Sequence, residues 1–403
     1  MPAVYNKSMP AVYITGAGMV SAIGFSVKET LLALREQRTG IAPITLFDTK
    51  LKHLPAGEVK CSDEELFRRA DMHPGRDVCS RTALLGLVAA QEAMRMSQSK
   101  VDKQRISLVS ATTTGGMRFH EKNAHTILAG TVEKKYIELL DCADAAQKIA
   151  GYFGISNNVT TVSTACSSSA NAIIVGARMI KTGIADKVLV GGADALTRFA
   201  LNGFNSLEIL SPGGCMPFDA HRNGISLGEG AAYLVLEAAA VAKPENILCR
   251  LSGYANTNEA YHQTASSPYG EGAVHAIRKA LDTAGLPAAG ISYINAHGTG
   301  TVINDLSEGR AIETVFGATV PPVSSTKGYT GHTLAAAGAA EAIISILAIQ
   351  HRLLFPNLRF TTQMPELSFL PQTALEENVP VNHVLSNSFG FGGSNAALIF
   401  SRP

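Results

Sequence analysis

The chain has 403 residues, of which 46% are hydrophobic and 17% charged, and its formal net charge is +1. A chain of this length exceeds a typical single domain, so we expect two domains or one large core in two parts. The charge balance excludes an overall field that would attract nucleic acid or an anionic membrane. An acidic partner would therefore have to bind a local basic patch.

The N-terminus and the cysteines predict a cytoplasmic location. The first residues, MPAVYNKSMPAVYITG, contain no basic segment followed by an apolar one, and we find no apolar run of the eighteen or so residues that a membrane helix requires. The six cysteines form no C-x-x-C pair, which favours reduced thiols and argues against a structural metal site. Because MPAVY occurs at both Met1 and Met9, either methionine is a candidate start.

Strand-like and helix-like segments alternate along the whole chain. Short runs rich in valine and leucine predict buried strands, and apolar residues at three-and-four spacing predict helices that cover a core. In chain order, the first half is expected to have strands at 11–15, 106–111, 159–163, 187–190 and 231–236, and helices at 28–35, 78–96, 143–153 and after Cys166. This alternation predicts an α/β protein whose helices cover its sheets.

The second half of the chain repeats the pattern of the first. VTTVST at 159–164 precedes a cysteine and a helix, and VPPVSS at 320–325 precedes a glycine-rich turn, a histidine and an alanine-rich helix. GEGAAYLVLE at 228–237 likewise has a counterpart in GGSNAALIFS at 392–401. Two matched pairs in the same order indicate duplicated halves, although any two strand–turn–helix units share such features. The halves would span residues 9–245 and 246–403.

One cysteine stands in the stretch VSTACSSSAN at 162–171. The strand expected before Cys166 and the helix expected after it would place the sulfur at a helix N-terminus, where the dipole and free N–H groups favour a thiolate and can hold an oxyanion. Most free cysteines are inert core residues, so this setting alone does not distinguish a nucleophile from a small buried side chain. The three serines that follow are expected to satisfy the turn.

Two histidines lie in comparable settings. His297, in YINAHGTGT, follows an apolar strand in a glycine-rich turn, and His332, in SSTKGYTGHTLAAAG, marks another strand-to-helix transition. A helix cap or a loop hydrogen bond explains either histidine on its own. Together with Cys166, however, they form a candidate Cys-His-His catalytic set.

Six segments carry a resemblance to a known family: TACSSSANAI around Cys166, GGADAL at Gly191, PFDAHRNGISLGEGAA from Pro217, NAHGTGTVINDLSE from Asn295, SSTKGYTGHTLAAAGAAE from Ser324 and NSFGFGGSNAALIF from Asn387. In content and order they resemble the β-ketoacyl-acyl carrier protein synthases of the elongating type, within the thiolase-like condensing enzymes. The resemblance implies a thiolase-like fold of five αβαβα layers with two duplicated halves. The nucleophilic cysteine would lie in the first half and the two catalytic histidines in the second, in what is usually a homodimer.

The resemblance also implies roles for individual residues. Cys166 would accept the acyl group, while His297 and His332 would hydrogen-bond the thioester carbonyl of malonyl-carrier and promote loss of carbon dioxide. The enolate would then attack the acyl group and extend it by two carbons, in fatty acid biosynthesis, with no cofactor beyond the phosphopantetheine of the carrier. The other matched residues are the supporting group Lys327, Glu341, Asp305 and Glu308, the gate Phe391, whose N–H would join that of Cys166 in an oxyanion hole, and the substrate-binding group Thr299, Thr301, Thr114 and Phe389.

Two departures from the family's pattern concern specificity. Where many elongating synthases have R-D-G-F, this chain has RNGI at 222–225. Thr114 occupies a position that is often apolar in the family and lines the acyl tunnel. A hydroxyl there predicts a pocket for a shorter, more polar or unsaturated chain.

The substrate implies a separate, small and acidic acyl carrier protein, since the chain contains no carrier-like segment. Arg68, Arg69 and Arg76 are candidates for its binding patch near the tunnel mouth, although a solvated helix face explains them as well. A degradative thiolase would present a second cysteine near the C-terminal glycine loop, a starter-type synthase would pair histidine with asparagine, and a non-catalytic chain-length partner would lack the nucleophile. A condensing enzyme of a polyketide or aryl-polyene pathway would carry the same triad and remains the alternative.

Overall fold

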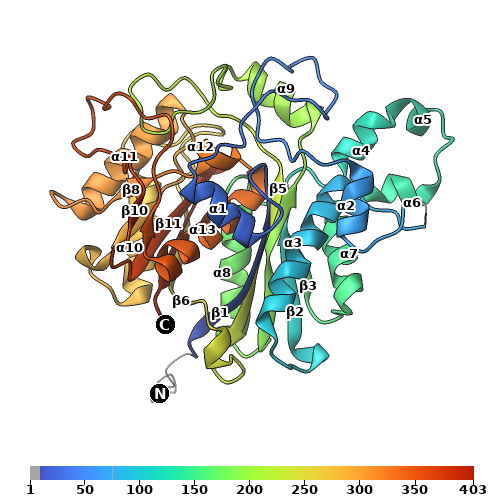
Figure 1. The fold of residues 1–403 in the computed structure, drawn as a ribbon, viewed down its shortest axis with the longest axis horizontal. Coiled ribbons are helices and arrows are strands. Elements are labelled where there is room, and N and C mark those ends of the chain that lie inside the picture. Colours follow the sequence, from blue (N-terminus) through green and yellow to red (C-terminus); the bar gives the residue numbers. More distant parts are fainter. Residues whose placement is uncertain (1–9, 75) are drawn as a thin grey trace.

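The computed structural model describes residues 10–74 and 76–403, so the two candidate starts, Met1 and Met9, lie outside the described residues. Figure 1 shows the arrangement of its elements. The strands are β1 (Val12–Val20), β2 (Ile106–Ala111), β3 (Val159–Val162), β4 (Lys187–Asp194), β5 (Gly230–Ala238), β6 (Cys249–Asn258), β7 (Tyr293–Asn295), β8 (Val323–Ser324), β9 (Leu353–Leu354), β10 (Glu376–Glu377), β11 (His383–Gly390) and β12 (Ser394–Ser401). The α-helices are α1 (Val27–Arg35), α2 (Asp63–Arg69), α3 (Arg81–Ser97), α4 (Met117–Lys122), α5 (Ala124–Leu128), α6 (Lys134–Ile137), α7 (Ala143–Phe153), α8 (Ser168–Lys181), α9 (Arg198–Ser206), α10 (Glu271–Ala284), α11 (Val302–Phe316), α12 (Lys327–Thr330) and α13 (Ala337–His351).

The main sheet consists of two halves with the same strand order. Its strands run β3-β2-β4-β5-β1-β6-β12-β11-β7-β8, and the short strands β9 and β10 pair separately. Outward from the junction of β1 and β6, one half runs β1, β5, β4, β2, β3 and the other runs β6, β12, β11, β7, β8. When the five strands of each half are numbered in chain order, both halves have the order first, fifth, fourth, second, third. The sequence pairs matched above fall on equivalent strands, β3 with β8 and β5 with β12. The expected boundary at 245–246 lies in the connection between β5 and β6.

Helices form three layers around these two sheet halves. α3 and α7 pack on the outer face of the first half, and α10, with α11 against it, covers the second. α8 and α13 lie between the halves and contact strands of both. Figure 1 shows this order from α10 and α11, at the left, through α8 and α13 to α3 and α7 at the right. The expected αβαβα arrangement is therefore confirmed.

The middle layer corrects one expectation. The segment Leu334–His351 is long and apolar enough to cross a membrane by length and composition, so the statement that no segment reaches this size is wrong. However, 89% of this segment is buried inside the protein. A helix that touches two sheet halves has no solvent-facing stripe to fill with polar residues, and this position accounts for its composition.

The first strand is longer than the sequence predicts. A strand was expected over 11–15, but β1 continues to Val20. A Cβ on Gly16 would lie 2.1 Å from the carbonyl oxygen of Ala93, and one on Gly18 would lie 2.0 Å from that of Ala89. These glycines therefore let α3 approach the strand closely.

Candidate active site

Cys166 lies in the turn between β3 and α8, at the helix N-terminus where the sequence places it. The preceding Ala165 has a φ of +52°, which costs a residue with a side chain roughly 1–2 kcal/mol. Two serines hold this strained turn. Ser168 Oγ accepts the N–H of Thr164 (2.8 Å) and donates to the carbonyl of Ala165 (2.5 Å), while Ser167 Oγ donates to the carbonyl of Thr164 (2.8 Å). The serine run satisfies the turn, as expected.

Burial raises the pKa of the Cys166 thiol to about 11, although the charge of Lys327 and the backbone N–H of Phe391 act in the opposite direction. Removal of the sulfur from water is the largest cause of this shift. At rest the side chain is a thiol. The N–H of Phe391 reaches the sulfur, so it lies where an oxyanion donor would act.

His297 follows β7 and is held by a buried lysine. Lys327 Nζ contacts His297 Nδ1 (3.2 Å) and donates to the His297 carbonyl (2.5 Å) and to the carboxylate of Glu341. Because an ammonium only donates, Nδ1 accepts, and the proton of the neutral ring is on Nε2. Burial lowers the pKa of His297 well below 6.5, and the charges of Lys327 and His332 lower it further.

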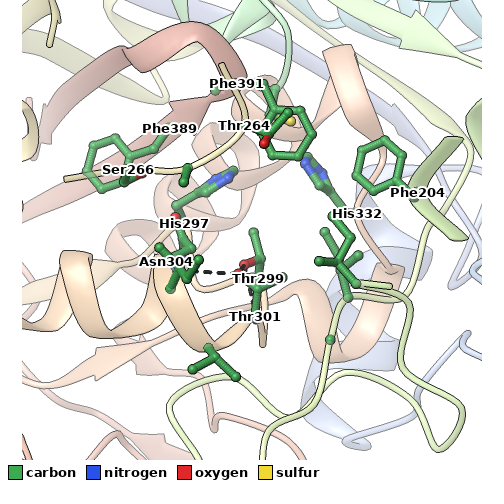
Figure 2. A pocket seen from close by; sticks show the side chains of 18 of the residues that line it. Phe204, Thr264, Ser266, His297, Thr299, Thr301, Asn304, His332, Phe389 and Phe391 are labelled. Carbon is green, nitrogen blue, oxygen red and sulfur yellow. Dashed lines mark hydrogen bonds between the residues drawn. The ribbon is translucent and has the colours of Figure 1, made fainter. Parts of the chain in front are cut away.

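His332 lies in the turn between α12 and α13, beside His297. The two ring centroids are 5.4 Å apart, with the planes nearly perpendicular at 86°. Figure 2 shows the imidazoles pointing toward each other, with Phe391 beside them. Burial, followed by the charge of Lys327, lowers the pKa of His332 well below 6.5. Both imidazoles are therefore neutral at pH 7, so each can offer an N–H to an oxygen that gains negative charge.

The acidic pair beyond His297 fixes the backbone of the same turn. Glu308 accepts the N–H groups of His297 (2.8 Å) and Gly298 (2.7 Å). Asp305 accepts the N–H of Gly300 (3.1 Å). Both carboxylates are fully buried and do not line the cavity. The two carboxylates thus hold the backbone of the turn that carries His297.

A cavity of about 190 Å³ joins the site to the surface. Seven of the residues singled out from the sequence line it together: Cys166, His297, His332, Thr299, Thr301, Phe389 and Phe391. Thr299 and Thr301 share a hydrogen bond (2.9 Å) at the start of α11. Within residues 10–74 and 76–403, no three His, Cys, Asp or Glu side chains are grouped as a metal site would require.

Four predicted residues lie elsewhere. Thr114 does not line the cavity, and its hydroxyl donates to Asp194 (2.9 Å). The Thr114 hydroxyl is therefore hydrogen-bonded inside the protein and does not face the acyl site in this structure. Arg68 and Arg69 lie on α2, where both pair with Glu65 (2.5 and 3.0 Å), and neither they nor Arg76 line the cavity.

The sequence did not indicate several residues that complete the site. Phe204 of α9 stacks on Phe391, with ring centroids 5.6 Å apart and planes inclined by 18°. Thr264 and Ser266 enter the cavity from the loop that follows β6. This loop has no periodicity, so only its position after folding identifies it. By contrast, the unusual Ile225 of the RNGI segment does line the cavity.

Comparisons with known proteins identify the family of the chain. The sequence matches the family "Beta-ketoacyl synthase, N-terminal domain" over residues 9–242 and "Beta-ketoacyl synthase, C-terminal domain" over residues 248–361. A 3-oxoacyl-[acyl-carrier-protein] synthase 2 of Staphylococcus aureus is 35% identical over 412 aligned residues, which cover 97% of this chain and 98% of that protein.

Solved structures give the same result. The ishigamide ketosynthase/chain length factor is 32% identical with a TM-score of 0.90, covering 98% of this chain and 100% of its own. A ketosynthase solved with its type II polyketide acyl-carrier protein and bound to a hexaketide is 26% identical with a TM-score of 0.87, with the same coverage. The chain therefore belongs to the β-ketoacyl synthase family and has its thiolase-like fold.

Proposed function

We propose that this condensing enzyme is a 3-oxoacyl-acyl carrier protein synthase of fatty acid biosynthesis. It joins an acyl group held on Cys166 to the two-carbon unit of malonyl-carrier. The observation that carries the proposal is that a buried cysteine and two neutral imidazoles line the same cavity. A nucleophile and two uncharged N–H donors are the groups that acyl transfer and enolate stabilisation need.

In the first step, Cys166 takes the acyl group from its carrier. A bond forms between Sγ and the acyl carbon, the carrier thioester bond breaks, and the thiol proton ends on the departing pantetheine sulfur. The N–H of Phe391, which already reaches Sγ, and that of Cys166 stabilise the negative oxygen of the tetrahedral intermediate. The first carrier then leaves, which makes the kinetics ping-pong.

In the second step, malonyl-carrier enters and loses carbon dioxide. The electron pair of the broken carbon–carbon bond forms an enolate, whose oxygen accepts hydrogen bonds from the two histidines. The enolate carbon attacks the acyl carbonyl, the bond to Cys166 breaks, and the released thiolate takes up a proton. Lys327 supports this step because it keeps Nδ1 of His297 as an acceptor and thus leaves the Nε2 proton for the substrate.

The partners follow from the substrate. The acyl group is carried by the phosphopantetheine of a separate acidic carrier protein, whose arm passes Thr299 and Thr301. This proposal is supported by the related ketosynthase that was solved with its acyl-carrier protein. We also propose that two copies form a homodimer in the cytoplasm and that the protein itself holds no cofactor.

Intact-mass analysis after incubation with acyl-carrier, followed by malonyl-carrier, tests this function. We expect an acyl adduct on the protein, its disappearance on addition of malonyl-carrier, and a 3-oxoacyl product two carbons longer. The variant Cys166→Ala should form no adduct, whereas Cys249→Ala, which changes another fully buried cysteine, should form it normally. An adduct that persists in Cys166→Ala would refute the assignment of the nucleophile.

The second candidate function is condensation in a polyketide or aryl-polyene pathway, with the same chemistry. The observation that favours it is the similarity, at a TM-score of 0.90, to the ishigamide ketosynthase/chain length factor. Loading rates with a series of saturated and conjugated acyl-carriers separate the two functions. A preference for conjugated chains, or several extensions without reduction, would support the second function. If mixing the protein with a non-identical homologue is required for activity, the homodimer proposal is wrong.

A further inference from the structure

The His332 ring has no side-chain partner, in contrast to that of His297. Neither Nδ1 nor Nε2 of His332 has a hydrogen-bond partner among the described residues. The position of this imidazole therefore depends on packing and on the backbone on either side of it. On the N-terminal side, the His332 N–H donates to the carbonyl of Ser226 (2.8 Å). The His332 carbonyl accepts the N–H of Gly228 (2.8 Å), so the segment 226–228 holds the backbone of His332 on both sides. The turn that follows His332 is held separately.

Asp194, the last residue of β4, holds this following turn. Its carboxylate accepts the N–H of Ala335 (2.9 Å), three residues after His332. Between them Leu334 has a φ of +52°, and a residue with a side chain keeps such a conformation only where its surroundings fix it. Asp194 and Ala335 are fully buried, so no bulk water competes for this hydrogen bond.

The other donors to Asp194 come from the three threonines that follow β2. The hydroxyls of Thr112 (2.6 Å), Thr113 (2.6 Å) and Thr114 (2.9 Å) all donate to it, as do the N–H groups of Thr113 and Thr114 (both 3.0 Å). A carboxylate offers about four lone-pair sites, so this one is saturated. Among the described residues its donors come from only two segments, the threonine loop of the first half and the turn after His332 of the second.

We propose that Asp194 is a positioning residue that fixes the His332 ring for decarboxylation. It joins the turn after His332 to the threonine loop and, through β4, to the sheet of the other half. This inference rests on the function proposed above for His332. It also gives the polar residues at 112–114 a role, because their hydroxyls saturate the carboxylate that holds the histidine.

A double-mutant cycle tests the proposal. Asp194→Asn replaces one acceptor oxygen with an amide that faces other donors, and malonyl-carrier decarboxylation should fall at least 100-fold, with less than a threefold change in KM. Thr113→Val keeps the side-chain volume and removes one hydrogen bond, so a three- to tenfold fall is expected. In a His332→Asn background, either substitution should lower the residual rate less than twofold, because both act through the ring that is already missing.

Glu58→Gln is the matched control. Glu58 is a fully buried carboxylate that accepts backbone N–H groups, such as those of Leu46 (3.1 Å) and Phe47 (2.6 Å), but it does not line the cavity. Its substitution should lower the urea midpoint and leave decarboxylation per folded molecule within twofold of the wild type. Equal fold-losses for Asp194→Asn with and without His332 would overturn the proposal. If Asp194→Asn does not fold, the cycle with Thr113→Val decides in the same way. A wild-type protein unable to decarboxylate malonyl-carrier would instead refute the function itself.

Discussion

At the scale of single residues, Lys327 determines which nitrogen of His297 carries the proton. In Lys327→Met this control is lost, so we expect decarboxylation of malonyl-carrier to fall about 100-fold, the usual size of an effect on transition-state hydrogen bonding. Acylation of Cys166 should fall less than tenfold. Single-turnover assays with malonyl-carrier and acyl-carrier measure the two steps separately.

Lys187→Met is the matched control for this prediction. Lys187 is also buried and pairs with a buried carboxylate, Glu237, at 3.0 Å, but it lies outside the cavity. Both variants leave a buried carboxylate unpaired and should lose stability. Only Lys327→Met should change the ratio of the two rates. A similar change in Lys187→Met would mean that the effect is one of general stability.

The pH dependence should reflect Glu341 and not the histidines. Burial raises the pKa of the Glu341 carboxyl to about 7, although Lys327 opposes the shift. As the pH falls through 7 the carboxylate takes up a proton and its ion pair with Lys327 weakens, while both histidines remain neutral. Decarboxylation should therefore fall below about pH 7. A pH–rate profile of wild type and Glu341→Gln tests this, since the variant should be slow and lack that limb.

The same pKa shift has a defined effect on stability. With its pKa raised from 4.5 to about 7, Glu341 keeps a proton in the folded state that the unfolded chain has already released. Its contribution to the free energy of unfolding is therefore greatest at acid pH and decreases between pH 4.5 and 7. Urea unfolding of wild type and Glu341→Gln at several pH values should show this difference. A wild-type curve that gains relative stability over that window would contradict the shift.

The residues that sequence could identify are those whose setting is local. Cys166, His297 and His332 stand at strand-to-helix transitions, which are visible in ten residues of sequence. The role proposed for Asp194 could not be predicted from sequence, because it depends on donors 80 and 141 residues away. The high pKa of Cys166 could not be predicted from sequence either, because local sequence indicates the helix dipole but not how deeply the sulfur is buried.

At the scale of elements, a glycine that is needed for close packing can be told from one that is not by replacing each with alanine. Gly18→Ala would place a Cβ 2.0 Å from the carbonyl of Ala89 and should cost more than about 3 kcal/mol, as severe overpacking does. Gly151→Ala, in α7 with nothing within 4 Å of its new Cβ, should add about 0.5–1 kcal/mol through helix propensity. Urea denaturation measures both. If Gly18→Ala stabilised the protein and Gly151→Ala destabilised it by similar amounts, the role assigned to the β1 glycines would be wrong.

Most elements of the first half were predicted to within a few residues, because their apolar patterns are strong. The boundaries of α3 show what remained uncertain. A helix was expected from residue 78, but α3 begins at Arg81, after Ser80 accepts the N–H of Ala83 as the N-cap. The short helices α4, α5 and α6 and the strand end at Val20 depend on contacts made only after folding, so periodicity did not reveal them.

At the scale of the whole molecule, the location of the carrier patch is the open prediction. Charge reversal by Arg68→Glu with Arg69→Glu should raise KM for acyl-carrier about tenfold and spare a small thioester mimic, since only the carrier needs the patch. Lys279→Glu, on the exposed face of α10, is the control and should change neither value. An equal loss with both substrates would indicate misfolding.

The order of strands in the two sheet halves has an evolutionary consequence. The corner after β3 carries Cys166, the proposed nucleophile, and the equivalent corner after β8 leads to Lys327 and His332, which are proposed to act in decarboxylation. An ancestor with two identical halves would have had the same side chains at both corners, around a two-fold axis. Divergence of one corner from the other would let one enzyme hold an acyl group at one corner and, by the mechanism proposed above, generate a carbon nucleophile at the other. The two steps of the proposed reaction would thus correspond to the two corners that became different.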